Sequence, residues 1–88
     1  MKTRVAVIAI IVDDNAASAA INRLLHEAAD FVVGRMGIPY REKGINIISV
    51  AVDAPQEVIS ALSGRIGRLP GVSVKTAYSG VVTETADD

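Results

Sequence analysis

The sequence predicts an α+β fold in which two strand-helix-strand units follow one another. Two runs of mostly apolar, β-branched residues, Val5 to Val12 and Ile45 to Val52, each end in Val-Asp and lead directly into a helical pattern. The copies are offset by 40 residues (52 − 12), which leaves room for one more strand after each helix. The 88 residues therefore predict one βαββαβ domain over residues 1–82 and a frayed tail over 83–88.

Both helices are expected to bury one apolar stripe. The first begins at Asp14 or Asn15, whose side chains can accept hydrogen bonds from the first turn. Its stripe consists of Ala17, Ala20, Ile21, Leu24, Leu25 and Ala28. The second helix starts near Pro55, where Asp53 and Gln56 are spaced for a capping box. Gly67 and then Pro70-Gly71 are expected to end it. Its stripe consists of Val58, Ile59, Leu62, Ile66 and Leu69.

The strands are expected to form one antiparallel sheet. Phe31 to Tyr40 contains two glycines and a proline, which are tolerated best at a sheet edge or bulge. Arg41-Glu42-Lys43-Gly44 suits a tight reversal into the strand from Ile45, and Val72 to about Val82 forms the last strand. Right-handed crossovers then place both helices on one face of a four-stranded sheet with the first and third strands central, a ferredoxin-like sandwich.

The other face of this sheet has no helix to cover it. A strand that faces water on one side should alternate apolar and polar residues, yet Val5 to Val12 has no polar residue and Ile45 to Val52 has only Asn46 and Ser49. Each Val or Ile that becomes covered contributes roughly 1.5–3 kcal/mol. We therefore expect a homo-oligomer, a dimer or tetramer, that packs through the open sheet face or a sheet edge.

Composition argues against several classes of protein. A formal charge of −1 gives no broad attraction to nucleic acid or to acidic membranes, and a chain with no cysteine has no disulfide or thiolate chemistry. The apolar start resembles a secretory signal only superficially, because Asp13-Asp14 interrupts it and no stretch approaches the ~20 apolar residues of a membrane span. We expect a cytoplasmic protein.

A small-molecule site, if present, should use basic residues. The candidates for anion binding are Arg35, Arg41, Lys43, Arg65, Arg68 and Lys75. Arg65 and Arg68 lie three residues apart on one helix face and could form a guanidinium fork for phosphate or carboxylate, while Arg41 and Lys43 lie on the hairpin. An ordinary solvated face explains the same residues. Gly64, beside the fork, is a glycine within a helix, which is unfavourable and calls for an explanation. Tight packing of helix on sheet is the favoured interpretation, and a ligand contact is the alternative.

Other chemistry-bearing residues have structural interpretations. His26 lies off the buried stripe and is expected to be a solvated imidazole rather than a metal ligand shared between subunits. Asp13 and Asp14 are expected to cap the first helix and compensate its dipole. The sequence therefore predicts no catalytic residue, no metal site and no cofactor, and its candidate ligand-binding residues are Arg41, Lys43, Gly64, Arg65 and Arg68.

Longer stretches resemble a known family. The segments Ile38-Pro39-Tyr40-Arg41-Glu42, Ala61-Leu62-Ser63-Gly64-Arg65-Ile66-Gly67 and Gly71-Val72-Ser73-Val74-Lys75-Thr76 closely resemble small regulators associated with iron-only hydrogenase systems. The resemblance covers nearly the whole chain. It implies an ACT-like fold related to the C-terminal domain of nickel-responsive repressors, and a role in transcriptional control.

The chain also departs from the better-understood relatives that this resemblance implies. Amino-acid-binding ACT domains commonly place glycine in the first strand-helix loop, which here reads Asp13-Asp14-Asn15-Ala16. Nickel-responsive relatives use several histidines and a cysteine, whereas this chain has only His26, so a homologous nickel site cannot be assembled. Those repressors also carry a ribbon-helix-helix domain, which 88 residues cannot include, so the sequence argues against direct DNA binding.

Two classes of function stay open. The favoured one is a non-enzymatic regulatory module that oligomerises and senses a small-molecule effector or docks on a partner protein. The alternative is a small enzyme of the dimeric α+β barrel type, which needs a base or metal in a cavity between sheet and helices, and the sequence offers none. A trimeric signalling protein of the P-II type would need a long loop where Arg41 to Gly44 allows only a tight turn.

Overall fold

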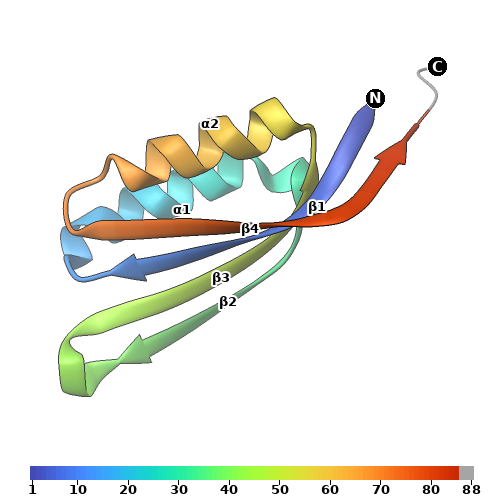
Figure 1. Cartoon of the computed structure of the whole chain (residues 1–88). Coiled ribbons are helices and arrows are strands. Elements are labelled where there is room, and N and C mark those ends of the chain that lie inside the picture. The colour runs from blue at the N-terminus through green and yellow to red at the C-terminus, as the bar shows by residue number, and fades with distance from the viewer. Residues whose placement is uncertain (86–88) are drawn as a thin grey trace.

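The protein is a two-layer α+β domain of the predicted βαββαβ order, described over residues 1–85 in a computed structural model. Its sheet has the order β2-β3-β1-β4 with antiparallel neighbours, so β1 and β3 are central as expected. Both helices lie on one side of the sheet (Figure 1). The elements are β1 (Lys2–Val12), η1 (Asn15–Ala17), α1 (Ser18–Glu27), η2 (Ala29–Phe31), β2 (Val32–Tyr40), η3 (Arg41–Lys43), β3 (Ile45–Ala54), α2 (Gln56–Gly67) and β4 (Val72–Glu84).

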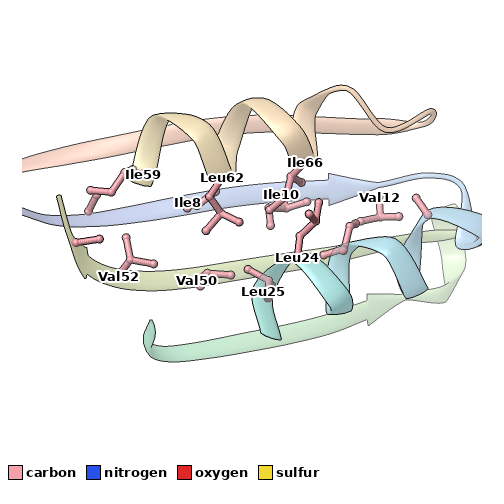
Figure 2. Packing of buried hydrophobic residues seen from close by; sticks show 14 residues of the cluster. Ile8, Ile10, Val12, Leu24, Leu25, Val50, Val52, Ile59, Leu62 and Ile66 are labelled. Atoms are coloured by element: carbon pink, nitrogen blue, oxygen red, sulfur yellow. The ribbon is translucent and has the colours of Figure 1, made fainter. Parts of the chain in front are cut away.

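An aliphatic core fills the space between the helices and the sheet (Figure 2). Alternate residues of β1 point into it, and Ile8, Ile10 and Val12 have no exposed surface. The buried residues are Ala6, Ile8, Ile10, Val12, Ala17, Ile21, Leu24, Leu25, Val50, Val52, Ala54, Ile59, Leu62 and Ile66. Both predicted helix stripes are thus confirmed except at Ala20, which is half-buried outside the cluster. Their central residues belong to the cluster, and Ala28, Val58 and Leu69 pack against it.

The junction from β1 to α1 is held by Asp14 and Gly71. The Asp14 carboxylate accepts a hydrogen bond of 3.0 Å from the Ala16 amide and so caps the 3₁₀ turn η1. The predicted capping of the first α-helix is confirmed only for this preceding turn, because α1 itself begins at Ser18 with no side-chain cap. The Asp13 amide donates to the Gly71 carbonyl at 2.8 Å. Gly71 has φ +70°, and a Cβ there would lie 2.5 Å from the Asp14 Cβ and 2.6 Å from a carboxylate oxygen of Asp13. The loop before β4 therefore packs directly on the start of the first helical segment.

The predicted capping box at the start of α2 is wrong. Pro55 is the N-cap residue, and no side-chain cap bond is made there. Gln56 instead accepts from Arg4 at 3.2 Å and donates to the Ser60 hydroxyl at 3.3 Å. Asp53 is still part of β3, where it pairs with Val5, because the strand continues to Ala54. The strand geometry turns the Asp53 side chain away from the helix that it was expected to cap.

Both edges of the sheet are irregular. β2 is the edge strand that its glycines and proline predicted, and its register with β3 shifts between Val32 and Gly34. On the other edge, the pairing of β4 with β1 shifts between Tyr78 and Val82. Here the Ser79 hydroxyl donates to the Val5 carbonyl at 2.7 Å and accepts from the Val81 amide at 3.1 Å. These bonds stabilise the bulge, after which the sheet continues as a ribbon of β1 and β4 (Figure 1).

β4 is longer than the sequence predicted. It extends to Glu84 rather than Val82, because Thr83 and Glu84 pair with Thr3 and Lys2 of β1. The Thr85 amide also donates to the Met1 carbonyl. The first residues of the predicted frayed tail are therefore part of the ribbon, while residues 86–88 lie outside the described residues.

Substitution of the two glycines with positive φ should distinguish the destabilising effect of backbone strain from that of a steric clash. Gly44 has φ +65° with nothing within 4 Å of an added Cβ, whereas Gly71 has both the positive φ and the contacts with Asp13 and Asp14. We expect Gly44→Ala to lower the free energy of unfolding by about 1 kcal/mol and Gly71→Ala by more than about 2 kcal/mol. Urea denaturation of the two variants measures the difference, and equal losses would contradict the role given to the Gly71 contact.

Candidate functional site

The structure separates the predicted basic residues into two groups. Arg41 and Lys43 lie in η3, at the end of the β2–β3 hairpin. Gly64 and Arg65 lie in α2, and Arg68 caps the C-terminus of that helix. Figure 1 shows the hairpin end well away from α2, so the five residues do not form one site within a single chain.

The environment of Gly64 corrects the favoured interpretation of this residue. A Cβ added at Gly64 would meet a single atom within 4 Å, the Nη2 of Arg68 at 3.8 Å. The glycine therefore does not serve a close approach of helix and sheet. In α2, Gly67 comes nearer to the sheet, with an added Cβ 3.9 Å from Val74. What lies over Gly64 is the Arg68 guanidinium, which brings these two predicted residues together.

The other arginine of the predicted fork is engaged with α1. Its guanidinium lies 3.5 Å from the Glu27 carboxylate, and more than half of each side chain is exposed. The same two residues lie at the rim of a groove of about 280 Å³ between the helices. The lining is mostly apolar, contributed by Leu24, Ala28, Phe31, Val58, Ala61 and Leu62, with Glu27, Glu57 and Arg65 as its charged members.

The remaining candidates of the sequence have solvated or structural surroundings. His26 is exposed on α1, as expected. Within residues 1–85, no group of three or more His, Cys, Asp or Glu side chains could hold a metal ion. No helix in this part of the chain is both long and apolar enough to cross a membrane.

The face of the sheet opposite the helices, called the open face below, carries a group of exposed apolar side chains. Directly paired residues of antiparallel strands share a face, so the open face follows from the register. It consists of Gly34, Met36, Ile38 and Tyr40 of β2, Ile45, Ile47, Ser49, Ala51 and Asp53 of β3, Val5, Val7, Ala9 and Ile11 of β1, and Ser73, Lys75 and Ala77 of β4.

Large side chains on the open face are substantially exposed. Val7, Ile11, Met36, Ile38 and Tyr40 have between 38% and 58% of their surface accessible, whereas Ile8 and Ile10 of the same central strand have none. Contiguous apolar surfaces of this kind are typical of interaction sites.

The open face also carries two charged residues, Asp53 and Lys75, which the sequence did not predict to share a surface. Asp53 was expected to cap a helix, and Lys75 was one of six dispersed cations. The signal that could have indicated this is the alternation of side chains along each strand, because Asp53 and Lys75 pair with Val5 and Ala9, which point to the same face of β1.

These observations define a small ferredoxin-like α+β domain with an uncovered apolar sheet face. The chain belongs to the family described as "TM1266-like: Iron-only hydrogenase system regulator, putative", whose model matches residues 4–76. The solved structure of the uncharacterized protein TM1266 from Thermotoga maritima is similar, with 35% identity and a TM-score of 0.83 over 86% of this chain and 96% of that one.

More distant structures share the fold alone. A formyltetrahydrofolate deformylase from Pseudomonas putida KT2440 is 14% identical, with a TM-score of 0.62 over 83% of this chain and 28% of that protein. An unknown protein from Galdieria sulphuraria is 19% identical, with a TM-score of 0.61 over 92% of this chain and 48% of the other. A comparison with curated proteins gives no match.

The ion pair between Glu27 and Arg65 should contribute little to stability, because both side chains are largely exposed. A double-mutant cycle of Glu27→Gln and Arg65→Gln, followed by urea denaturation, should give a coupling free energy below about 1 kcal/mol that falls further in salt. Such a weak pair leaves Arg65 available to an anionic ligand at small cost. A coupling clearly above that value would assign Arg65 to the stability of the helix pair instead.

Proposed function

We propose that the protein is a non-enzymatic regulatory module that works as a homo-oligomer, assembled through the open face. In this proposal it acts in the cytoplasm in transcriptional control of an iron-only hydrogenase system, and it responds to a small-molecule effector or docks on a partner protein. Its fold is of the ACT-like kind, related to the C-terminal domain of nickel-responsive repressors.

The observation that carries the proposal is the open face itself. Five large apolar side chains are exposed there together, two of them on β1 and three on β2. The central strand β1 has apolar residues on both of its faces. Burial of such side chains against a second copy contributes roughly 25 cal/mol for each Å² removed from water. The description of the family as a hydrogenase-system regulator supports the regulatory part.

A ligand of the module would most simply bind at the groove between α1 and α2. Arg65 lines this groove beside apolar side chains and is held by Glu27 only through an exposed ion pair. A small acid or phosphate with an apolar part could replace Glu27 as the partner of Arg65. Arg41 and Lys43 lie on the distant hairpin and would serve the same ligand only from another subunit.

A charge on the open face should dissociate the oligomer. Ile11 is 38% exposed on the central strand, so Ile11→Asp should cost an isolated chain about 2 kcal/mol, from lost apolar burial and the low strand propensity of Asp. In an oligomer the same carboxylate would be buried without a partner, which is strongly unfavourable. Light scattering at micromolar concentration should show a wild-type dimer or tetramer and an Ile11→Asp monomer.

The matched control is Tyr78→Asp. Tyr78 is 43% exposed but pairs with Ala6, so it lies on the helix side of the sheet. This variant should keep the wild-type mass. A wild-type protein that is monomeric under these conditions would overturn the proposal.

Regulation of transcription, in this proposal, does not use direct contact with DNA. The chain has a formal charge of −1, which gives no electrostatic footprint for phosphate binding. The purified protein should therefore cause no shift of duplex DNA at physiological ionic strength in a mobility assay. A shift that weakens steeply with salt would show direct binding and contradict this part of the proposal.

A further inference from the structure

The carboxylate of Asp53 lacks a partner on the open face. Its Oδ1 is buried and has no hydrogen-bond partner among the described residues. A buried acceptor without a partner costs free energy, and more when it is charged. The negative charge of Asp53 is thus uncompensated within the chain, and a cation that a second copy placed over this part of the open face would stabilise it electrostatically.

Lys75 is the only cation on the open face as the register defines it. It lies on β4 opposite Ala9 of β1, is exposed, and forms no ion pair or hydrogen bond with the described residues 1–85. Asp53 is the only anion of this face. The open face therefore carries one charge of each sign on an otherwise uncharged and largely apolar surface.

The two charges are too far apart to meet within one chain. Asp53 lies beside Val5 on one side of β1, and Lys75 lies beside Ala9 on the other side. Their positions differ by two strand spacings across the sheet, at ~4.8 Å each, and by four residues along the strands, at ~3.4 Å each. Together these offsets place the two residues about 17 Å apart. An ion pair requires contact within about 4 Å.

On the sheet, Val7 lies midway between Asp53 and Lys75. It is on β1, two residues from Val5 and two from Ala9, and 40% of its surface is exposed. A two-fold axis in the interface that passes over Val7, at right angles to the line between the charges, places each Lys75 over the Asp53 of the other copy. Self-complementarity of this kind is what a two-fold interface requires.

We infer that two copies pack open face to open face about a two-fold axis near Val7, with Lys75 of each copy paired to Asp53 of the other. This inference rests on the oligomer of the proposed function and specifies its register. Apolar side chains provide most of the buried area, and the two symmetric ion pairs select this register over others. The partner's ammonium also compensates the carboxylate that a single chain leaves without a hydrogen bond.

Charge reversal tests the pairing. Lys75→Glu alone and Asp53→Lys alone should each weaken the homodimer by about tenfold or more, because each brings like charges together twice. An equimolar mixture of the two variants should form a heterodimer as tight as the wild type, since every contact is again between opposite charges. Sedimentation equilibrium of each variant and of the mixture measures the three dissociation constants.

Two results would overturn parts of this picture in distinguishable ways. A monomeric wild-type protein overturns the oligomer and the inference together. A dimeric wild type whose dissociation constant is unchanged by Lys75→Glu, or a mixture that does not restore affinity, overturns the pairing and leaves the oligomer standing. Lys75 is exposed, so its variant keeps the test decisive even where Asp53→Lys fails to fold, which far-ultraviolet circular dichroism reports.

A cross-link tests the position of the axis. The natural chain has no cysteine, so Val7→Cys introduces a single thiol at the proposed axis. Because packed sheets lie ~10 Å apart, a short bismaleimide should join the two copies at this position. Tyr78→Cys, on the helix side, should stay uncross-linked at the same protein concentration. A Val7→Cys dimer that resists cross-linking would place the axis elsewhere.

Discussion

The central strand β1 has apolar side chains on both faces, and the chain covers only one of them. Ile8, Ile10 and Val12 are fully buried against the helices, while Val7 and Ile11 of the same strand remain partly exposed. A βαββαβ chain with right-handed crossovers places both helices on one side of its sheet. The connectivity that builds the core therefore also leaves the opposite face without cover, and the architecture and the candidate interaction surface have one cause.

Most of the fold could be predicted from local patterns. Val5 to Val12 and Ile45 to Val52 are long β-branched runs, and the helix stripes have the regular spacing of buried faces, so element order, strand order and edge positions follow. The two local predictions that were wrong concern residues whose surroundings depend on how the elements pack together. Asp53 was expected to cap α2, but β3 continues through it, and Gly64 was expected to pack on the sheet, but its open side faces Arg68.

The candidate site could be predicted only in part. Its apolar character was apparent because β1 and β3 do not alternate, but its charged members were not, because the phase of a strand relative to its neighbours depends on register. Asp53 and Lys75 are 22 residues apart in sequence (75 − 53) and share a face only through their separate pairings with β1. The basic residues predicted together as anion-binding candidates also lie in separate parts of the fold, because Arg41 and Lys43 are at the hairpin end and Arg65 is in α2.

The irregular edges of the sheet have a consequence for the size of any assembly. Pro39 has no amide hydrogen to donate and β2 has a register shift, while β4 has the bulge that Ser79 holds in place. Regular hydrogen bonding of one sheet to the next is interrupted on both sides. In the proposed dimer, association would instead be perpendicular to the plane of the sheet. A two-fold contact of that kind would cover the apolar face of both molecules and leave no regular strand edge on which a fibril could grow.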